Sequence, residues 1–141
     1  MTVVTFTVPG KPQGKGRPRV GRVGGFSRMF TPEKTVSYEN LIGWTAAQAM
    51  AGRTLLLGPV AVSLHIAMEV TASWSKAKQA RALAGTESPT TKPDMDNVIK
   101  AVFDAINGVV WKDDVQVVQL TTTKAYAAAP GVTVEVAEAL K

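Results

Sequence analysis

The sequence contains no cysteine and only one histidine among its 141 residues. The lack of cysteine excludes disulfide bonds, a thiolate nucleophile and zinc held by cysteine, and one histidine is too few for a site built from several imidazoles. Any metal ion would therefore be held by oxygen atoms.

Long apolar segments are also missing. The run from Val60 to Ala67 is interrupted by Ser63 and His65, whereas a membrane span needs about 20 apolar residues. The first six residues alternate like a strand and lack the charged and apolar regions of a signal peptide. We therefore expect a cytoplasmic protein with no membrane partner.

The remaining composition predicts one folded domain over residues 1–141. Hydrophobic residues make up 45% of the chain, which is enough apolar surface to offset the ordering entropy of folding. A chain of this length is typical of one compact domain.

Charge is unevenly distributed along the chain, whose formal net charge is +5. The first 34 residues hold seven Lys and Arg against one acid, Glu33. All five aspartates fall in a later segment: Asp94, Asp96, Asp104, Asp113 and Asp114. This separation suits an enzyme that binds a polyanion with one region and a divalent cation with another.

Alternation and turn residues predict the element order β-α-β-α-α-β-β. Strands are expected at 2–8, 60–70, 115–124 and 132–136, and helices at 31–51, 73–84 and 95–106, the first of them capped by Thr31. Residues 10–30 are rich in glycine, proline and basic side chains and are predicted to form a mobile loop. This order predicts an α+β fold with a small mixed sheet and helices packed on one face.

The helix at 95–106 has a regular apolar stripe. Its members recur at the helical period: Met95, Val98, Ile99, Val102, Phe103 and Ile106. The opposite face carries Asp96, Lys100 and Asp104 at i, i+4 and i+8, so these side chains lie on one side of the helix. Lys100 can pair with Asp96 to stabilise the helix, or it can reach a phosphate.

The aspartates likewise have two interpretations. Asp94 and Asp96 suit the helix N-terminus, and Asp113-Asp114 suits a polar turn. If the chain folds back after Asn107-Gly108, four carboxylates meet at one end of the sheet. They would repel one another unless a cation balanced them, and Mg²⁺ accepts such oxygen ligands.

Two segments resemble the RusA family of Holliday junction resolvases. The pattern D-x-D-N-x-x-K-x-x-x-D-A is followed by D-D-x-Q-V, carried here by residues 94–105 and 113–117. The N-terminal strand, the basic loop and the Thr31-Pro32 helix start are also similar to the phage and prophage branch of that family.

The resemblance implies a homodimeric endonuclease that depends on Mg²⁺, with Mn²⁺ as a substitute. Such an enzyme nicks four-way (Holliday) DNA junctions symmetrically, in DNA recombination and repair, inside a bacterial cell or a phage-infected bacterium. By motif position, Asp94, Asp96 and Asp114 are the essential metal-binding carboxylates. Lys100 is the catalytic lysine and Asp113 is an accessory metal-binding acid.

DNA contacts are expected mainly from the basic loop. Asn97 sits where it could bond a phosphate at the helix N-terminus, and Lys76 belongs to an aromatic and lysine segment that starts at Trp74. The full set of candidate DNA-binding residues is Lys15, Arg17, Arg19, Arg22, Arg28, Asn97 and Lys76.

Two alternatives remain open. A non-catalytic nucleic-acid-binding protein would explain the basic loop, but clustered carboxylates repel phosphates. A nuclease that cuts flaps or forks rather than four-way junctions would share every one of these motifs.

Overall fold

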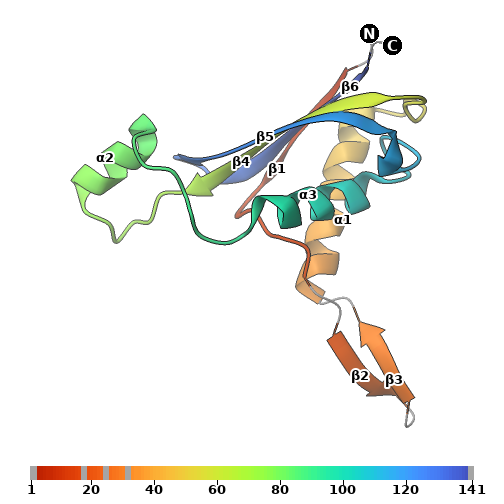
Figure 1. Ribbon diagram of the computed structural model, residues 1–141, viewed down its shortest axis with the longest axis horizontal. Helices are drawn as coiled ribbons and strands as arrows, with labels where there is room; N and C mark the ends of the chain where they lie inside the picture. The colour runs from red at the N-terminus through yellow and green to blue at the C-terminus, as the bar shows by residue number, and fades with distance from the viewer. Residues whose placement is uncertain (1–2, 17–18, 24–25, 31–32, 140–141) are drawn as a thin grey trace.

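The computed structural model describes residues 3–16, 19–23, 26–30 and 33–139. Its elements, shown in Figure 1, are β1 (Val3–Pro9), β2 (Arg19–Val23), β3 (Phe26–Phe30), α1 (Glu33–Met50), β4 (Val60–Glu69), α2 (Lys76–Ala84), α3 (Met95–Ile106), β5 (Val117–Ala127) and β6 (Gly131–Glu138). A 3₁₀ turn (Asp114–Gln116) precedes β5. Within these ranges, no helix is both long and apolar enough to cross a bilayer.

Four strands form the main sheet in the order β1-β6-β4-β5. The β1–β6 and β6–β4 pairs are antiparallel, and β4 and β5 are parallel neighbours. Parallel neighbours need a long crossover connection, and here the crossover contains α2 and α3. The mixed sheet predicted from the sequence is confirmed.

The core lies between one face of this sheet and the helices α1 and α3. Alternate residues of β1, β4 and β6 are buried, as period-2 strands require. From the helices, the largest buried contributions include Tyr38, Ile42, Val102 and Ile106. The other sheet face carries exposed polar residues such as Ser63 and His65. Helices α1 and α3 therefore pack on one face of the sheet, as expected for this α+β fold.

The segment 10–30, predicted as a loop, contains a β-hairpin instead. Strands β2 and β3 pair in antiparallel register from Arg19↔Phe30 to Val23↔Phe26. They are separated in sequence by Gly24-Gly25, a dipeptide typical of two-residue hairpin turns. The many glycines and basic residues hid this short-range signal. Figure 1 shows the hairpin standing away from the four-stranded sheet.

The helices begin and end close to where the sequence predicts. Gly85 and Gly108, with φ of 83° and 78°, follow α2 and α3 in the left-handed conformation that glycine tolerates best. Ser75 caps α2, its Oγ accepting a hydrogen bond from the Lys78 backbone N–H at 3.2 Å. Thr31, the predicted cap of α1, lies outside the described residues.

Candidate functional site

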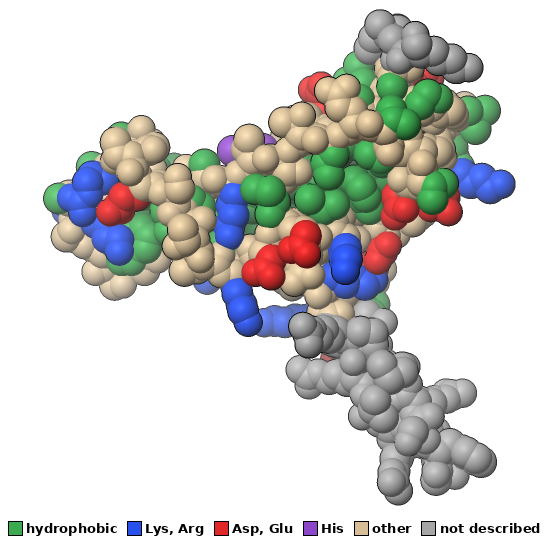
Figure 2. All heavy atoms as spheres, viewed as in Figure 1, with side chains coloured by type: hydrophobic (Ala, Val, Ile, Leu, Met, Phe, Trp, Pro, Cys, Tyr) green, Lys and Arg blue, Asp and Glu red, His purple; other side chains and the backbone are tan. Residues whose placement is uncertain are grey.

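Helix α3 displays the candidate catalytic residues. Its apolar stripe packs into the core, with Val98, Val102 and Ile106 fully buried. Asp96, Lys100 and Asp104 are exposed on the opposite face. This confirms that the three side chains share one side of the helix. Figure 2 shows acidic groups over α3 and the residues after it, with basic side chains between them.

Asp94 occupies the N-cap position of α3 but does not act as a cap. Its backbone is extended, with φ −65° and ψ 145°, and its carboxylate accepts no capping hydrogen bond from the helix. The prediction that the Asp94 side chain caps the N-terminus of α3 is therefore wrong. The exposed carboxylate is left available for another partner.

Lys100 does not stabilise α3 through the expected ion pair. The nitrogen–oxygen contacts within 4.0 Å among described residues do not include Lys100 with Asp96. Both side chains are exposed on the surface at a spacing of one helical turn.

The segment before the hairpin is docked on α3. The Lys15 backbone N–H donates to the Asn97 carbonyl at 3.0 Å, and the Gly16 N–H donates to Thr35 Oγ1 at 2.9 Å. A Cβ added at Gly14 would lie 2.8 Å from the Asn97 Cβ. Because that is closer than carbon atoms approach, only glycine fits where the chain crosses the helix.

Lys15, one of the residues predicted to contact DNA, lies between two carboxylates. Its Nζ is 2.8 Å from Glu39 Oε2 on α1 and 2.9 Å from Asp104 Oδ2 on α3. Partial burial disfavours the charge, but the hydrogen bonds and charges of Glu39 and Asp104 outweigh it and raise the pKa of Lys15. Lys15 thus joins the N-terminal segment to both helices.

A hollow opens where this segment meets the start of α3. Its volume is about 700 Å³, and it is lined by Gly14, Lys15, Lys92, Pro93, Asp94 and Asn97. Three predicted site residues, Lys15, Asp94 and Asn97, therefore share one cavity, together with the basic side chain of Lys92. Such a cavity can admit an anionic group beside a carboxylate.

Lys124 fixes the wall of this hollow. It lies on β5, and its Nζ donates to the carbonyls of Thr91 and Pro93 at 2.5 and 2.9 Å. Thr91 and Pro93, in the segment that leads into Asp94, are thereby held against the sheet. Lys124 is a positioning residue for the start of α3.

Asp113 has the capping role expected of Asp94. Its carboxylate accepts from the Val115 N–H at 3.3 Å, while Gln116 Oε1 accepts from the Asp113 N–H at 3.1 Å. The Gln116 side-chain amide also donates to the carbonyls of Leu56 and Gly58. This reciprocal capping box anchors the 3₁₀ turn, and the polar-turn interpretation of the second aspartate pair is confirmed.

Asp114 lies at the C-terminal end of α3. Burial, the neighbouring Asp113 charge and a more distant Asp104 charge raise the pKa of Asp114, against a hydrogen bond from the Asn107 side chain. Asn107 is the C-cap of α3, whereas Asp94 is at its N-cap. A helix of 12 residues is about 18 Å long.

The expected cluster of four carboxylates at one end of the sheet is therefore wrong for a single copy of the chain. The chain folds back after Asn107-Gly108, but it returns to the far end of α3. Across the described ranges, no three His, Cys, Asp or Glu side chains come together as a ready-made metal cage. Instead, Asp94 and Asp96 lie at the N-terminal end of α3, whereas Asp114 lies near its C-terminal end, where the charges of Asp113 and Asp104 act on it.

The remaining candidate DNA contacts are spread over two regions. Arg19 and Arg22 belong to β2 and Arg28 to β3, but the conformations of their side chains, and all of Arg17, lie outside what the structure describes. Lys76 is the exposed first residue of α2.

Three residues that organise the site were missed by sequence reasoning. Glu39 and Lys124 look like ordinary surface charges in an amphipathic helix and an alternating strand. Gly14 is one of several glycines in its segment. Their roles depend on contacts across long sequence separations, so no local pattern indicated them. Glu39 pairs with Lys15, Lys124 bonds the segment before α3, and Gly14 packs against Asn97.

Comparison with known proteins places this fold and acidic helix in a class of DNA-cutting enzymes. Residues 9–137 match the family model described as Endodeoxyribonuclease RusA, and the chain belongs to this family of junction-resolving endodeoxyribonucleases. A curated relative, "Uncharacterized protein YqaN" of Bacillus subtilis (strain 168), is 38% identical over 140 residues, covering 98% of each chain.

Proposed function

We propose that this protein is a Mg²⁺-dependent, structure-specific endodeoxyribonuclease that resolves four-way DNA junctions by paired symmetric nicks. It would act in recombination and repair, in the cytoplasm of a bacterium or phage-infected bacterium. Family membership supports nuclease activity on such junctions.

The observation that carries the proposal is the uncommitted carboxylate of Asp94. An aspartate at an N-cap normally bonds the first turn of its helix, yet this one does not. It lines a hollow with Lys92 and Asn97, and Asp96 follows two residues later. A carboxylate that makes no capping hydrogen bond and lies beside basic side chains is suited to bind a metal ion together with a phosphate.

The donor chemistry of Asp94 and Asp96 fits Mg²⁺. This ion takes one or two carboxylates and completes its octahedral shell with waters and substrate phosphate oxygens, so a larger protein cage is unnecessary. Mn²⁺ prefers similar oxygen ligands and would substitute. The ion would polarise the scissile phosphate and activate the attacking water.

Lys100 would act one helical turn beyond Asp96. Without an ion-pair partner among the described carboxylates, its ammonium is available to offset negative charge on the phosphate as the bond breaks.

Asp114 is proposed as a third essential carboxylate, acting with Asp113 from the other end of α3. Burial and the charges of Asp113 and Asp104 disfavour the ionised form of Asp114, so a bound divalent cation would stabilise this carboxylate.

The projecting hairpin of β2 and β3 would bind DNA. Arg17, Arg19, Arg22 and Arg28 fall in or beside β2 and β3, and hairpins are narrow enough to enter a DNA groove. Asn97 and Lys76 would contribute phosphate contacts from α3 and α2. Lys15 would support them by holding the base of the hairpin.

A homodimer would supply the two nicks. β5 is an edge strand of the sheet, and Val118 and Leu120 on it are 64% and 40% exposed, as is Val115 before it at 80%. Edge strands with exposed apolar side chains are ready to pair with another chain. We propose that a second copy covers this edge.

Cleavage of a mobile four-way junction, compared with flap, fork and linear duplex DNA, tests the proposal. Paired nicks in the junction that require Mg²⁺, and that are lost in Asp94→Asn, are expected. Preferred cutting of flaps or forks would identify a different branched substrate. Tight binding with no cutting in Mg²⁺ or Mn²⁺ would indicate a non-catalytic binding protein.

A further inference from the structure

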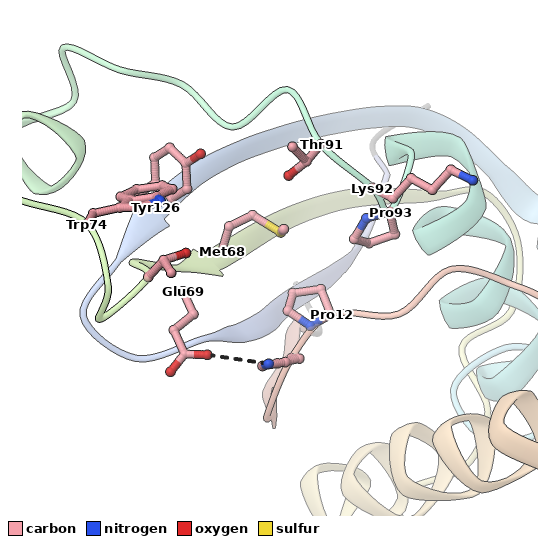
Figure 3. Close-up of a pocket in the computed structure, with 10 residues that line it drawn as sticks. Pro12, Met68, Glu69, Trp74, Thr91, Lys92, Pro93 and Tyr126 are labelled. Carbon is pink, nitrogen blue, oxygen red and sulfur yellow. Dashed lines mark ion pairs between the residues drawn. The ribbon is translucent and has the colours of Figure 1, made fainter. Parts of the chain in front are cut away.

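A second cavity lies directly beside the hollow that contains Asp94. Its volume is about 330 Å³, and Figure 3 shows Trp74 and Tyr126 on one side of it, Lys92 and Pro93 on the other, and Met68 between them. Lys92 and Pro93 line both cavities. The second cavity, here named the aromatic pocket, therefore adjoins the hollow that Asp94 lines.

Two aromatic rings form the apolar wall of this pocket. The Trp74 and Tyr126 rings meet edge to face, with centroids 5.3 Å apart and planes at 84°. Lys78 Nζ lies 4.3 Å from the centre of the Trp74 ring, a cation–π contact that fixes the indole. The wall is thus preorganised rather than assembled by a ligand.

Basic side chains surround the apolar wall. Lys11, which is 81% exposed at its side chain, pairs only weakly with Glu69 at 4.0 Å, and Lys92 is also exposed. A ligand with a flat apolar part and an attached anion would match this combination. Nucleotides have this chemistry, since bases pack on aromatic side chains and phosphates pair with lysine.

The size of the pocket determines whether a paired or an unpaired base can enter it. A volume near 330 Å³ is at the lower end for small-ligand sites, so it suits one base and excludes a base pair. A base reaches such a pocket only when it is unpaired or turned out of the stack. Unpaired or easily unpaired bases occur where strands separate, as at a branch point.

We propose that the aromatic pocket binds one unpaired nucleobase of the DNA substrate, next to the phosphate that is cut at Asp94. This inference rests on the proposed nuclease function and extends it to how branched DNA is recognised. Lys124 and Tyr126, two residues apart on β5, point to the same face of the strand. One holds the residues before Asp94 and the other lines the pocket, so the two sites are fixed to each other.

Coupling between protein and DNA changes provides the test. Junction affinity is measured in Ca²⁺, with each nucleotide next to the branch point replaced in turn by an abasic residue. For the unmodified protein, one position should lose affinity about tenfold, the scale of base–aromatic stacking. In Trp74→Ala and Tyr126→Ala, that same abasic junction should bind as well as the intact one.

Two controls separate this result from misfolding or a general loss of binding. Tyr126→Phe keeps the ring and should retain the abasic penalty. Trp44→Ala removes a tryptophan that is 64% exposed and does not line the pocket, so it should retain the penalty too. In a Trp44→Phe background, junction DNA should also quench Trp74 fluorescence, since the remaining Trp111 is fully buried.

If the abasic substitution lowers junction affinity as much in Trp74→Ala and Tyr126→Ala as in the unmodified protein, the aromatic pocket does not bind a base. This holds even if the protein cuts junctions in Mg²⁺. Conversely, lost penalties and Trp74 quenching in a protein that cuts no branched DNA would support the pocket and reject the nuclease proposal.

Discussion

Lys15 and Asp104 form an ion pair of 2.9 Å between residues separated by 89 positions in the chain. With the Glu39 contact at 2.8 Å, this pair attaches the base of the hairpin to α3. The position of a proposed DNA-binding arm is thus tied to the helix that carries the proposed catalytic residues.

Replacing Lys15 with methionine should lower stability by about 1 kcal/mol, the upper part of the range for partly exposed pairs. Because the folded-state pKa is raised above 10.5, this contribution is present below pH 10.5 and is lost as pH rises through the folded value. Thermal melts should therefore converge for the two proteins in strong alkali. Lys112→Met, at an exposed lysine, is the matched control and should melt like the parent.

Asp94→Asn should slow cutting strongly without unfolding the protein. Loss of a charged metal ligand is expected to slow cleavage by 10³ or more, at about 1.4 kcal/mol per tenfold. Junction affinity in Ca²⁺ should hold or rise because a negative charge near the phosphates is removed. The Asp94 side chain makes no capping bond. The free energy of unfolding of Asp94→Ala should therefore lie within a few tenths of a kcal/mol of the parent value.

Asp113→Ala provides the contrast, because Asp113 does cap its turn. It should destabilise the protein by about 1 kcal/mol, the usual loss for a removed cap. Equal melting of Asp94→Ala and Asp113→Ala would contradict the assigned roles. Cleavage by Asp94→Asn within tenfold of the parent would remove Asp94 from the proposed metal site.

Asp114→Asn should separate stability from activity. The raised pKa means that the ionised form is disfavoured in the folded protein. This cost is fully present above the folded pKa and vanishes as pH falls below the ordinary value of 3.8. The variant should melt a few degrees higher than the parent at pH 7 and equally near pH 3, yet cleave far more slowly. A lower melting temperature at pH 7 would show that Asp114 stabilises the fold as an anion.

Replacing Arg17, Arg19, Arg22 and Arg28 together with alanine tests the hairpin as a DNA-binding arm. If each arginine neutralises one phosphate, the slope of log affinity against log salt should fall by roughly three to four units. Fluorescence anisotropy with labelled junctions over a salt series measures the slope. An unchanged slope would show that the hairpin does not contact DNA.

Val118→Glu tests association through β5. A charge placed on an exposed apolar edge should disfavour pairing with a second copy, so sedimentation should change from dimer to monomer at micromolar concentration. Thr5→Glu, on an exposed face of β1, is the matched control. A monomeric parent that makes both nicks together would exclude the dimer.

The elements that could be predicted from the sequence are those with strong local patterns. The apolar stripe of α3 and the period-2 alternation of β4 each show which side of the element is buried against the core. Gly85 and Gly108 marked helix ends because a left-handed residue is needed there. The hairpin was missed because its only clear signal, Gly24-Gly25, sits among many other glycines.

The site was predictable in residue identity but not in arrangement. The spacing of Asp96, Lys100 and Asp104 fixed one helix face, whereas the side to which Asp114 returns depends on the turn held by Gln116 to the Leu56 and Gly58 carbonyls. The free state of Asp94 depends on its own torsions and hydrogen bonds. No sequence pattern distinguishes a capping aspartate from one that merely occupies the cap position.

The strand order has a consequence for when the enzyme can become active. Among the described strands, β6 comes last in the sequence, yet it lies between β1 and β4 and joins them. A nascent chain on the ribosome therefore cannot complete the sheet until residues 131–138 have emerged. Pairing of β1 and β6 closes nearly the whole chain into one loop, which makes the contact slow to form. In partly synthesised chains, the sheet against which α3 packs would thus be incomplete. The nuclease would become active only after β6 has been synthesised and has paired.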